Sequence, residues 1–194
     1  MIRTGFIIDN PRTGSHTVVL KADAELDSRG WLLQSRCLPN ALPDITEHLH
    51  LTWTETFEIV SGKAYYSLDG VQETAVAGES FTVKPGQRHI HPWCAGDEEM
   101  VFRQHNDFGG QNPDAVQDVL GVFATIAQFA AKGQVDSLGR PKNPLQLAVT
   151  VKTLGKHGGY DTSLPIFAQK FLAATLGRLA EALGYRAVAP EFYQ

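Results

Sequence analysis

The sequence has 194 residues, of which 43% are hydrophobic and 20% are charged, and its formal net charge is −4 at pH 7. These values are normal for a globular protein with a buried core. The acidic balance gives no electrostatic attraction to nucleic acid or to an anionic membrane, so we expect neither as a partner.

The residues up to about 106 predict a series of short strands. The segments are rich in β-branched and aromatic residues, and turn pairs such as Asp69-Gly70 and Pro85-Gly86 separate them at close intervals. The expected strands lie within 16–20, 31–37, 48–53, 55–60, 63–68, 73–76, 80–83 and 99–104. Many short strands with regular turns are typical of a β-sandwich or barrel.

After this region the pattern changes to that of helices. Apolar residues recur at intervals of three and four, and the pairs Asn112-Pro113 and Asn143-Pro144 each offer a cap and a first helical position. The expected helices span 112–133, 143–155 and 163–184, although the β-branched run 149–151 leaves a strand open for the second. We therefore predict a β domain over 1–108 and a helical extension over 109–194. The apolar stripes of the extension must pack against the barrel, each other or a second subunit.

Two histidines and a glutamate stand close together in the middle of the strand region. His48 and His50 project to the same side of a strand, with their rings roughly 6–7 Å apart. Glu55 begins the next strand and lies beside them, and the bend at Pro85-Gly86 leads to His89. Three imidazoles and one carboxylate suit Fe(II), Mn(II), Ni(II), Zn(II) or Cu(II).

The spacing of these residues resembles the conserved motifs of the cupin superfamily. His48-x-His50, four residues, Glu55, six residues and Gly62 match the first cupin motif, and the segment 78–89 is similar to the second. The resemblance implies a mainly β fold, a double-stranded β-helix or jelly-roll barrel, with a C-terminal α-helical extension that adds no activity. It also implies that His48, His50, Glu55 and His89 hold one divalent transition metal.

Several other residues are candidates for the site. His91 lies two positions after His89, so in a regular strand it points to the same side and is a candidate acid or base. The alternative is a histidine at the rim of the barrel, because we expect Pro92 to interrupt the strand. Either Arg103 or Gln104 faces the interior, and an inward arginine would pair with a substrate carboxylate. Candidates for the pocket walls are Trp53, Phe57, Phe81, Trp93 and Phe102.

Two functional hypotheses follow from these residues. The first is a metalloenzyme of the oxygenase, isomerase or decarboxylase type that acts on a small organic molecule. The alternative is a non-catalytic cupin that binds a metal or small ligand as a sensor or store.

The apolar helices favour a homodimer. The two cysteines, Cys37 and Cys94, indicate free thiols, and the N-terminus lacks a long apolar core, so we expect no signal peptide and a cytoplasmic protein.

Overall fold

Two antiparallel sheets form the strand region of the computed structural model, which describes residues 1–22, 25–26, 30–110 and 114–193. The first sheet has the order β1-β2-β3-β10-β5-β8 and the second the order β11-β4-β9-β6-β7. The first contains β1 (Ile7–Asn10), β2 (Ser15–Ala22), β3 (Trp31–Cys37), β5 (Thr54–Ser61), β8 (Ser80–Val83) and β10 (Met100–Asp107). The second contains β4 (His48–His50), β6 (Lys63–Leu68), β7 (Val71–Val76), β9 (His89–Cys94) and β11 (Gly159–Asp161). The predicted mainly β fold is confirmed.

Side chains that alternate along the strands fill the space between the two sheets. Along β10, Phe102, Gln104 and Asn106 are buried, while Arg103 between them points outward. Phe57 and Ile59 on β5 are fully buried and pack with Met100 in one apolar cluster. This cluster fills one part of the barrel, and the polar residues of β10 mark another part.

Helices make up most of the chain after residue 114. α1 (Ala115–Ala131) and α2 (Pro144–Lys156) are followed by α3 (Ile166–Leu172), the π-helical segment η2 (Ala173–Gly177), α4 (Arg178–Ala182) and the short 3₁₀ helix η3 (Pro190–Phe192). The second predicted helix is a helix and not a strand, because Asn143 caps it by accepting hydrogen bonds from the backbone of Leu145 and Gln146. The predicted start of the first helix, Asn112-Pro113, lies outside the described residues. In the described part of the chain, no helix is long and apolar enough to span a membrane.

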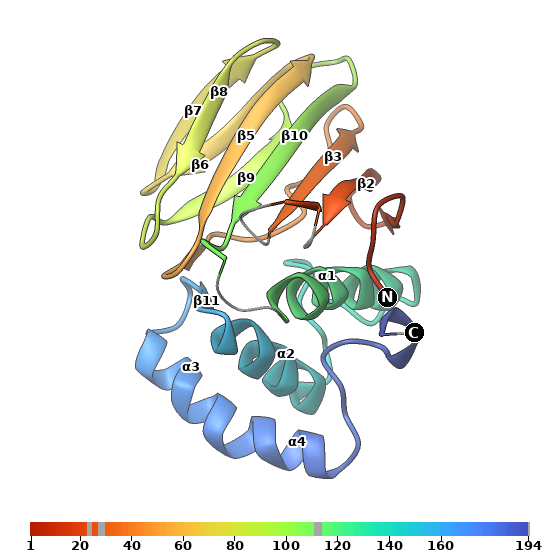
Figure 1. Cartoon of the computed structure of the whole chain (residues 1–194), viewed down its shortest axis with the longest axis vertical. Coiled ribbons are helices and arrows are strands. Elements are labelled where there is room, and N and C mark those ends of the chain that lie inside the picture. Colours follow the sequence, from red (N-terminus) through yellow and green to blue (C-terminus); the bar gives the residue numbers. More distant parts are fainter. Residues whose placement is uncertain (23–24, 27–29, 111–113, 194) are drawn as a thin grey trace.

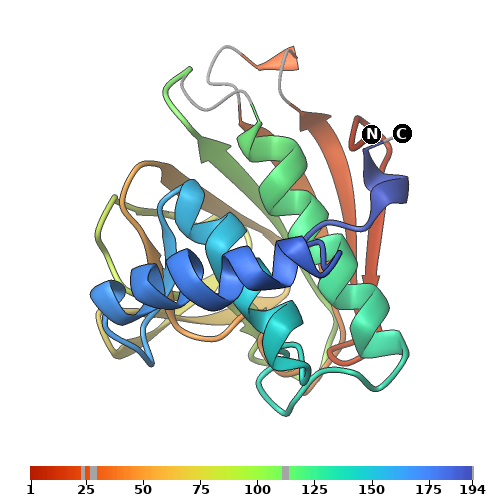
Figure 2. The ribbon, with the colours of Figure 1, turned by 90° about the horizontal axis from the view of Figure 1, so that it is seen from below.

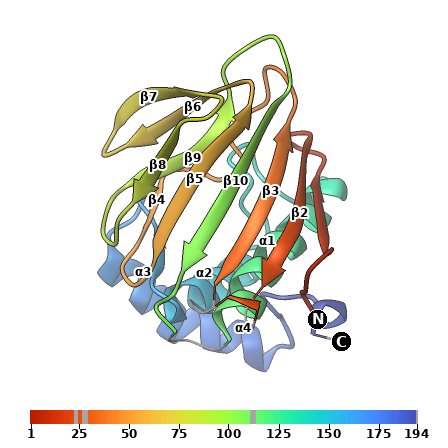
Figure 3. The ribbon, with the colours of Figure 1, turned by 45° about the horizontal axis from the view of Figure 1, so that its top comes forward.

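The helices cover one end of the strand region (Figure 1). Seen from that end, α1, α2 and the continuous helix α3–α4 lie across the opening between the sheets (Figure 2). Figure 3 shows the strands of the first sheet running side by side toward these helices. The short strand β11, which follows α2, pairs with β4 and so joins the helical part of the chain to a sheet.

The apolar stripe of the last helix faces outward. Phe167 is 77% exposed and Phe171 is 71% exposed, and Leu179 and Leu183 are also exposed. The side of this helix that packs against the rest of the chain carries small or polar residues instead, such as Ala180 and Gln169. The sequence left three possible partners for this stripe: the barrel, the other helices and a second subunit. Neither the barrel nor the other helices cover it.

Candidate metal centre

Short strands bring the motif histidines together at the covered end of the barrel. In β4, His48 and His50 lie on the same side, and His48 is directly opposite His89 of β9. The ring centroids of His48 and His89 are 4.1 Å apart, and those of His50 and His89 are 4.9 Å apart. His50 and His89 are fully buried. The spacing read from the sequence therefore places these imidazoles in one cluster.

Glu55 is the second residue of β5, and it lies opposite Asn106 of the neighbouring strand β10 and beside the histidines. Three side chains donate hydrogen bonds to its Oε1 atom: Trp53 Nε1 at 3.3 Å, Gln104 Nε2 at 3.2 Å and Asn106 Nδ2 at 2.6 Å. Gln104 Nε2 also donates to Asn106 Oδ1 at 2.8 Å. These bonds fix the carboxylate so that its other oxygen, Oε2, points at the imidazoles.

Three imidazole nitrogens surround that oxygen. His89 Nε2 and His91 Nε2 each lie 3.1 Å from Glu55 Oε2, and His50 Nε2 lies 3.3 Å from it. The contact with His50 has the distance of an ion pair, but not the geometry of a hydrogen bond, and His50 Nε2 is a buried atom without a hydrogen-bond partner among the described residues. A buried polar nitrogen of this kind requires a partner.

The opposite ring nitrogens of the motif histidines contact backbone carbonyls. The Nδ1 atoms of His48, His50 and His89 lie 2.9, 2.8 and 3.2 Å from the carbonyl oxygens of Thr46, Trp53 and Gln87. A carbonyl only accepts, so each Nδ1 carries a proton, and in its neutral form each of these rings presents a lone pair at Nε2. A lone pair at Nε2 repels the carboxylate oxygen that it faces unless a cation lies between them. Histidines that bind a metal usually make such bonds to backbone carbonyls at the other ring nitrogen.

The chain was also compared with known proteins. Residues 38–103 match the family profile described as a cupin domain. The chain contains a cupin domain. The matched residues include all four predicted ligands of the cupin motifs and end in β10.

Solved cupin structures resemble parts of the chain. A predicted oxalate decarboxylase of Thermotoga maritima is 15% identical, with a TM-score of 0.47, over 56% of this chain and 99% of that one. An uncharacterised Klebsiella pneumoniae protein with a double-stranded β-helix domain is 24% identical, with a TM-score of 0.36, over 57% and 79% of the two chains. The cupin domain of Schizosaccharomyces pombe Cnp3 is 12% identical, with a TM-score of 0.42, and the match spans 48% of this chain and 64% of that one. No curated protein matches the sequence.

The electrostatics of the cupin site favour the carboxylate form of Glu55 and the neutral form of His48. Burial lowers the pKa of His48 well below its usual value, and repulsion from His89 and His91 lowers it further. Burial alone would raise the pKa of Glu55, but attraction to His91 and His50 outweighs it and holds that pKa well below its usual value. Deprotonated ligands are the form that binds a metal.

The residues of this cupin domain fit a divalent transition metal. Ligand atoms of His48, Glu55, His89 and His91 all lie within 4.8 Å of one another. This group shares three members with the predicted set and contains His91 in place of His50. The contacts at Nδ1 distinguish His50 from His91. His50 Nδ1 donates to the backbone carbonyl of Trp53, whereas His91 Nδ1 makes no such bond to the described residues. His50 is therefore committed to a lone pair at Nε2, while His91 is free to donate its Nε2–H to Glu55.

The expectation that Pro92 interrupts the strand at His91 is wrong. β9 continues through Pro92 to Cys94, and its pairing with β6 shifts register between the pairs Tyr65↔Trp93 and Ser67↔Ile90. A bulge of this kind accommodates a proline inside a sheet and increases the local twist. His91 is consequently 6% exposed and inside the cluster, not at the rim.

Other sequence candidates divide between the cavity and the surface. Gln104, not Arg103, faces the interior, and Arg103 contacts Gln34 and Glu58 on the outer face instead. Trp53 and Phe102 line the cavity beside the cupin site, whereas the other three aromatic candidates do not. Asn106 was not singled out from the sequence. Asn106 lies two positions after Gln104 on the same strand and therefore faces the same side, and this alternation could have identified it from the sequence.

Proposed function

We propose that this chain is a mononuclear metal-binding cupin that acts on a small organic molecule through His48, His50, Glu55 and His89. One observation carries the proposal: the buried Nε2 atom of His50, held as a lone pair by the bond at Nδ1, lies 3.3 Å from a carboxylate oxygen with no donor between them. A divalent cation would satisfy both groups. Fe, Mn, Ni, Zn or Cu each fits a set of three imidazoles and one carboxylate.

A bound metal would polarise oxygen atoms of a substrate as a Lewis acid. Around it, the residues of this chain have separate roles. Gln104 and Asn106 orient Glu55. The backbone carbonyls of Thr46, Trp53 and Gln87 orient the imidazoles of the three motif histidines. His91 lines the cavity and holds a proton at Nε2 that it shares with Glu55, so it is our candidate for proton transfer. This arrangement supports an oxygenase, isomerase or decarboxylase more than a site that only stores a metal.

The alternative is a cupin that binds a metal and a small ligand without turnover. It differs from the enzyme in one measurable way, because ligand binding would then leave the ligand unchanged. Oxygen uptake, or product formation from a bound ligand, would decide for the enzyme.

Metal content of the full chain, purified without a polyhistidine tag, tests the proposal. We expect about one transition metal per chain by elemental analysis, and loss of that metal in the variants His50→Ala and His89→Ala. The variant His16→Ala is a matched control, because His16 lies on β2 and pairs with Asp9 outside the cluster. Protein that contains no metal and fails to bind Fe, Mn, Ni, Zn or Cu on titration would overturn the proposal.

His91 is tested separately from the ligands. We expect His91→Ala to retain most of its metal, because that residue has a proton at Nε2 rather than a committed lone pair. Loss of metal equal to that of His50→Ala would instead place His91 among the ligands.

We also propose that two copies of the chain pair through α3–α4. The two exposed phenylalanines and the exposed leucines lie along a helix of about 25 Å. Each aromatic side chain buries about 150–250 Å² in an interface, so the stripe offers several hundred Å² per copy, which approaches the about 800 Å² per partner of a stable complex. A second copy presents the same stripe and covers it symmetrically.

We also propose a cytoplasmic location, because unpaired cysteines are typical of proteins in a reducing environment. Cys37 and Cys94 are both unpaired and buried. Burial raises the pKa of the Cys37 thiol to about 12, so it behaves as a structural residue and not as a reactive one.

A further inference from the structure

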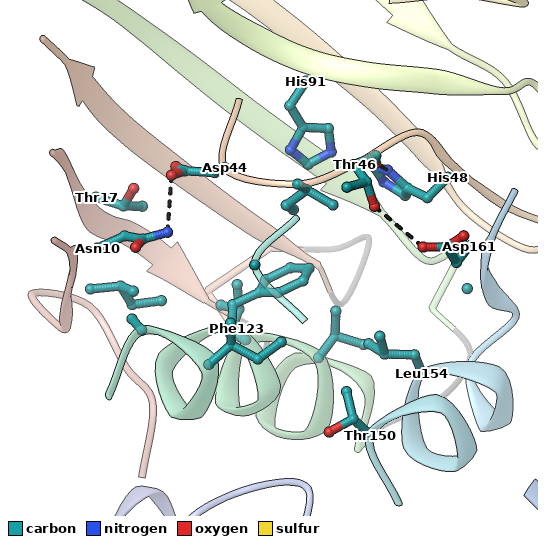
Figure 4. Close-up of a pocket in the computed structure, with 18 of the residues that line it drawn as sticks. Asn10, Thr17, Asp44, Thr46, His48, His91, Phe123, Thr150, Leu154 and Asp161 are labelled. Carbon is teal, nitrogen blue, oxygen red and sulfur yellow. Dashed lines mark hydrogen bonds between the residues drawn. The ribbon is translucent and has the colours of Figure 1, made fainter. Parts of the chain in front are cut away.

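A cavity of about 210 Å³ separates the metal cluster from the C-terminal helices. At about 30 Å³ per water molecule, this volume has room for roughly seven water-sized groups. Figure 4 shows His48 and His91 on one side of the cavity and Phe123 and Leu154 on the other. The barrel therefore supplies the reactive face, and helices that lie outside the matched cupin domain supply the opposite face.

The helical face is apolar. Phe123 and Leu120 come from α1, and Leu154 comes from α2. Leu120 is fully buried, and the other two side chains pack against the same core cluster. Packing in a core of this kind holds side chains in fixed positions, so the wall is preformed. A ligand that reaches the histidines must place an apolar surface against this wall.

The polar rim of the cavity carries acceptors rather than cations. Asp44 and Asp161 both line it, in addition to Glu55. Asp44 Oδ1 accepts hydrogen bonds from Asn10 and Thr13, and no described residue donates to its Oδ2. Asp161 Oδ2 accepts a hydrogen bond from Thr46 at 3.3 Å. These carboxylates attract hydrogen-bond donors and repel a second carboxylate.

Among the described residues that line the cavity, Arg140 is the only lysine or arginine, and it is already paired. Its Nε atom lies 3.0 Å from Asp136 Oδ2, and the backbone N–H of Arg140 donates to the same carboxylate. Apart from the proposed metal, the described lining therefore contains no lysine or arginine that lacks an acidic partner and could pair with a ligand phosphate or carboxylate.

We propose that the helical region is the substrate-selecting wall of the cupin site. In this arrangement the cavity takes a small molecule with an apolar body and with hydroxyl or amine donors, and it disfavours one that carries a carboxylate or phosphate. Of the three proposed reaction classes, this substrate class favours the oxygenase and the isomerase over the decarboxylase. The apolar body packs on Phe123 and Leu154, and the donors face Asp44 and Asp161. This inference rests on the proposed function, because it names the substrate class of the same site.

Three probes of nearly equal size test the selection: benzyl alcohol, benzylamine and benzoate. Each is titrated into the full chain and followed by calorimetry. We expect dissociation constants on the order of 1 mM for benzyl alcohol and benzylamine, as suits ligands of this size. Benzoate should bind at least about tenfold more weakly. In the double variant Asp44→Asn/Asp161→Asn, benzylamine should lose its advantage over benzoate while benzyl alcohol is little affected.

The wall is tested with the variant Phe123→Ala, which should weaken both favoured probes about tenfold. Phe129→Ala is the matched control, because Phe129 lies on the same helix but does not line the cavity. Preference for benzoate, absence of binding by both favoured probes, or equal weakening by the two phenylalanine variants would overturn the inference. Metal content measured on the same samples separates the two ideas, because metal-loaded protein with the wrong preference contradicts only the substrate class. Metal-free protein contradicts the proposed function.

Discussion

Asn106→Ala should weaken metal binding without removing any ligand. Asn106 is fully buried, and its amide donates the shortest of the three hydrogen bonds that hold Glu55 Oε1. A hydrogen bond to a charged group contributes about 1.5–3 kcal/mol. Each 1.4 kcal/mol corresponds to a tenfold change in affinity, so metal affinity should fall about 10- to 100-fold. The same substitution removes one of the two acceptors of the buried Gln104 amide, which should lower the free energy of unfolding by about 1–3 kcal/mol.

The two effects are measured separately. Competition with a chromophoric chelator gives the Zn(II) affinity, and urea unfolding of the metal-free protein gives the stability. Arg103→Ala is the control on the same strand, because Arg103 points away from the site and should leave both quantities nearly unchanged. If the folded Asn106→Ala protein binds Zn(II) within twofold of the wild type, the carboxylate does not depend on this amide and our account of its orientation is wrong.

Three further predictions concern stability and assembly. Asp118→Asn should lower the free energy of unfolding by about 3 kcal/mol at pH 7, because it breaks the buried contact of 2.7 Å with His157. Burial alone would raise the pKa of Asp118, but hydrogen bonds from His157 and two other donors hold it well below its usual value. The stabilisation is present above the unfolded pKa of about 4, so the difference between variant and wild type should shrink in urea titrations as the pH falls below that value; a constant difference would contradict this assignment. Phe167→Glu/Phe171→Glu should convert the expected homodimer to a monomer in light scattering, and a wild-type monomer would refute the pairing through this helix. Gly62→Ala should lower the thermal midpoint and cost about 1–3 kcal/mol, because Gly62 has a φ of +78° and an added Cβ would lie 2.7 Å from a backbone oxygen; an unchanged midpoint would show that this turn relaxes freely.

Local spacing was enough to predict eight strands, the helices and the cluster of motif histidines, but β1 was not among the predicted strands. The alternation of His48 and His50 is a property of one strand, and the Asn143 cap is a property of one turn, so both can be read from neighbouring residues. The strand β11 could not be predicted in this way, because it has three residues and exists only through its pairing with β4. The same is true of the bulge at Pro92, which depends on the register of β6.

The cavity shows the larger limit of sequence reasoning. Phe123 and Leu154 have the ordinary spacing of apolar helix residues, and nothing local distinguishes a side chain that fills a core from one that faces a ligand. The resemblance to cupins assigned no activity to the helices, yet these helices form one wall of the cavity. Only the packing of α1 and α2 across the end of the barrel reveals that wall.

The position of β4 has a consequence for the order of folding. His48 pairs with a single residue of β9, whereas all three residues of β4 pair with β11. The backbone of Leu51 also donates to Gly158, and Thr162 donates to Glu47, so both ends of β4 are tied to residues more than 100 positions away. Closing so long a loop is slow compared with forming a hairpin. On a ribosome, the barrel strands emerge long before residue 161, and the imidazoles of β4 reach their final positions only after residues 159–161 have been synthesised.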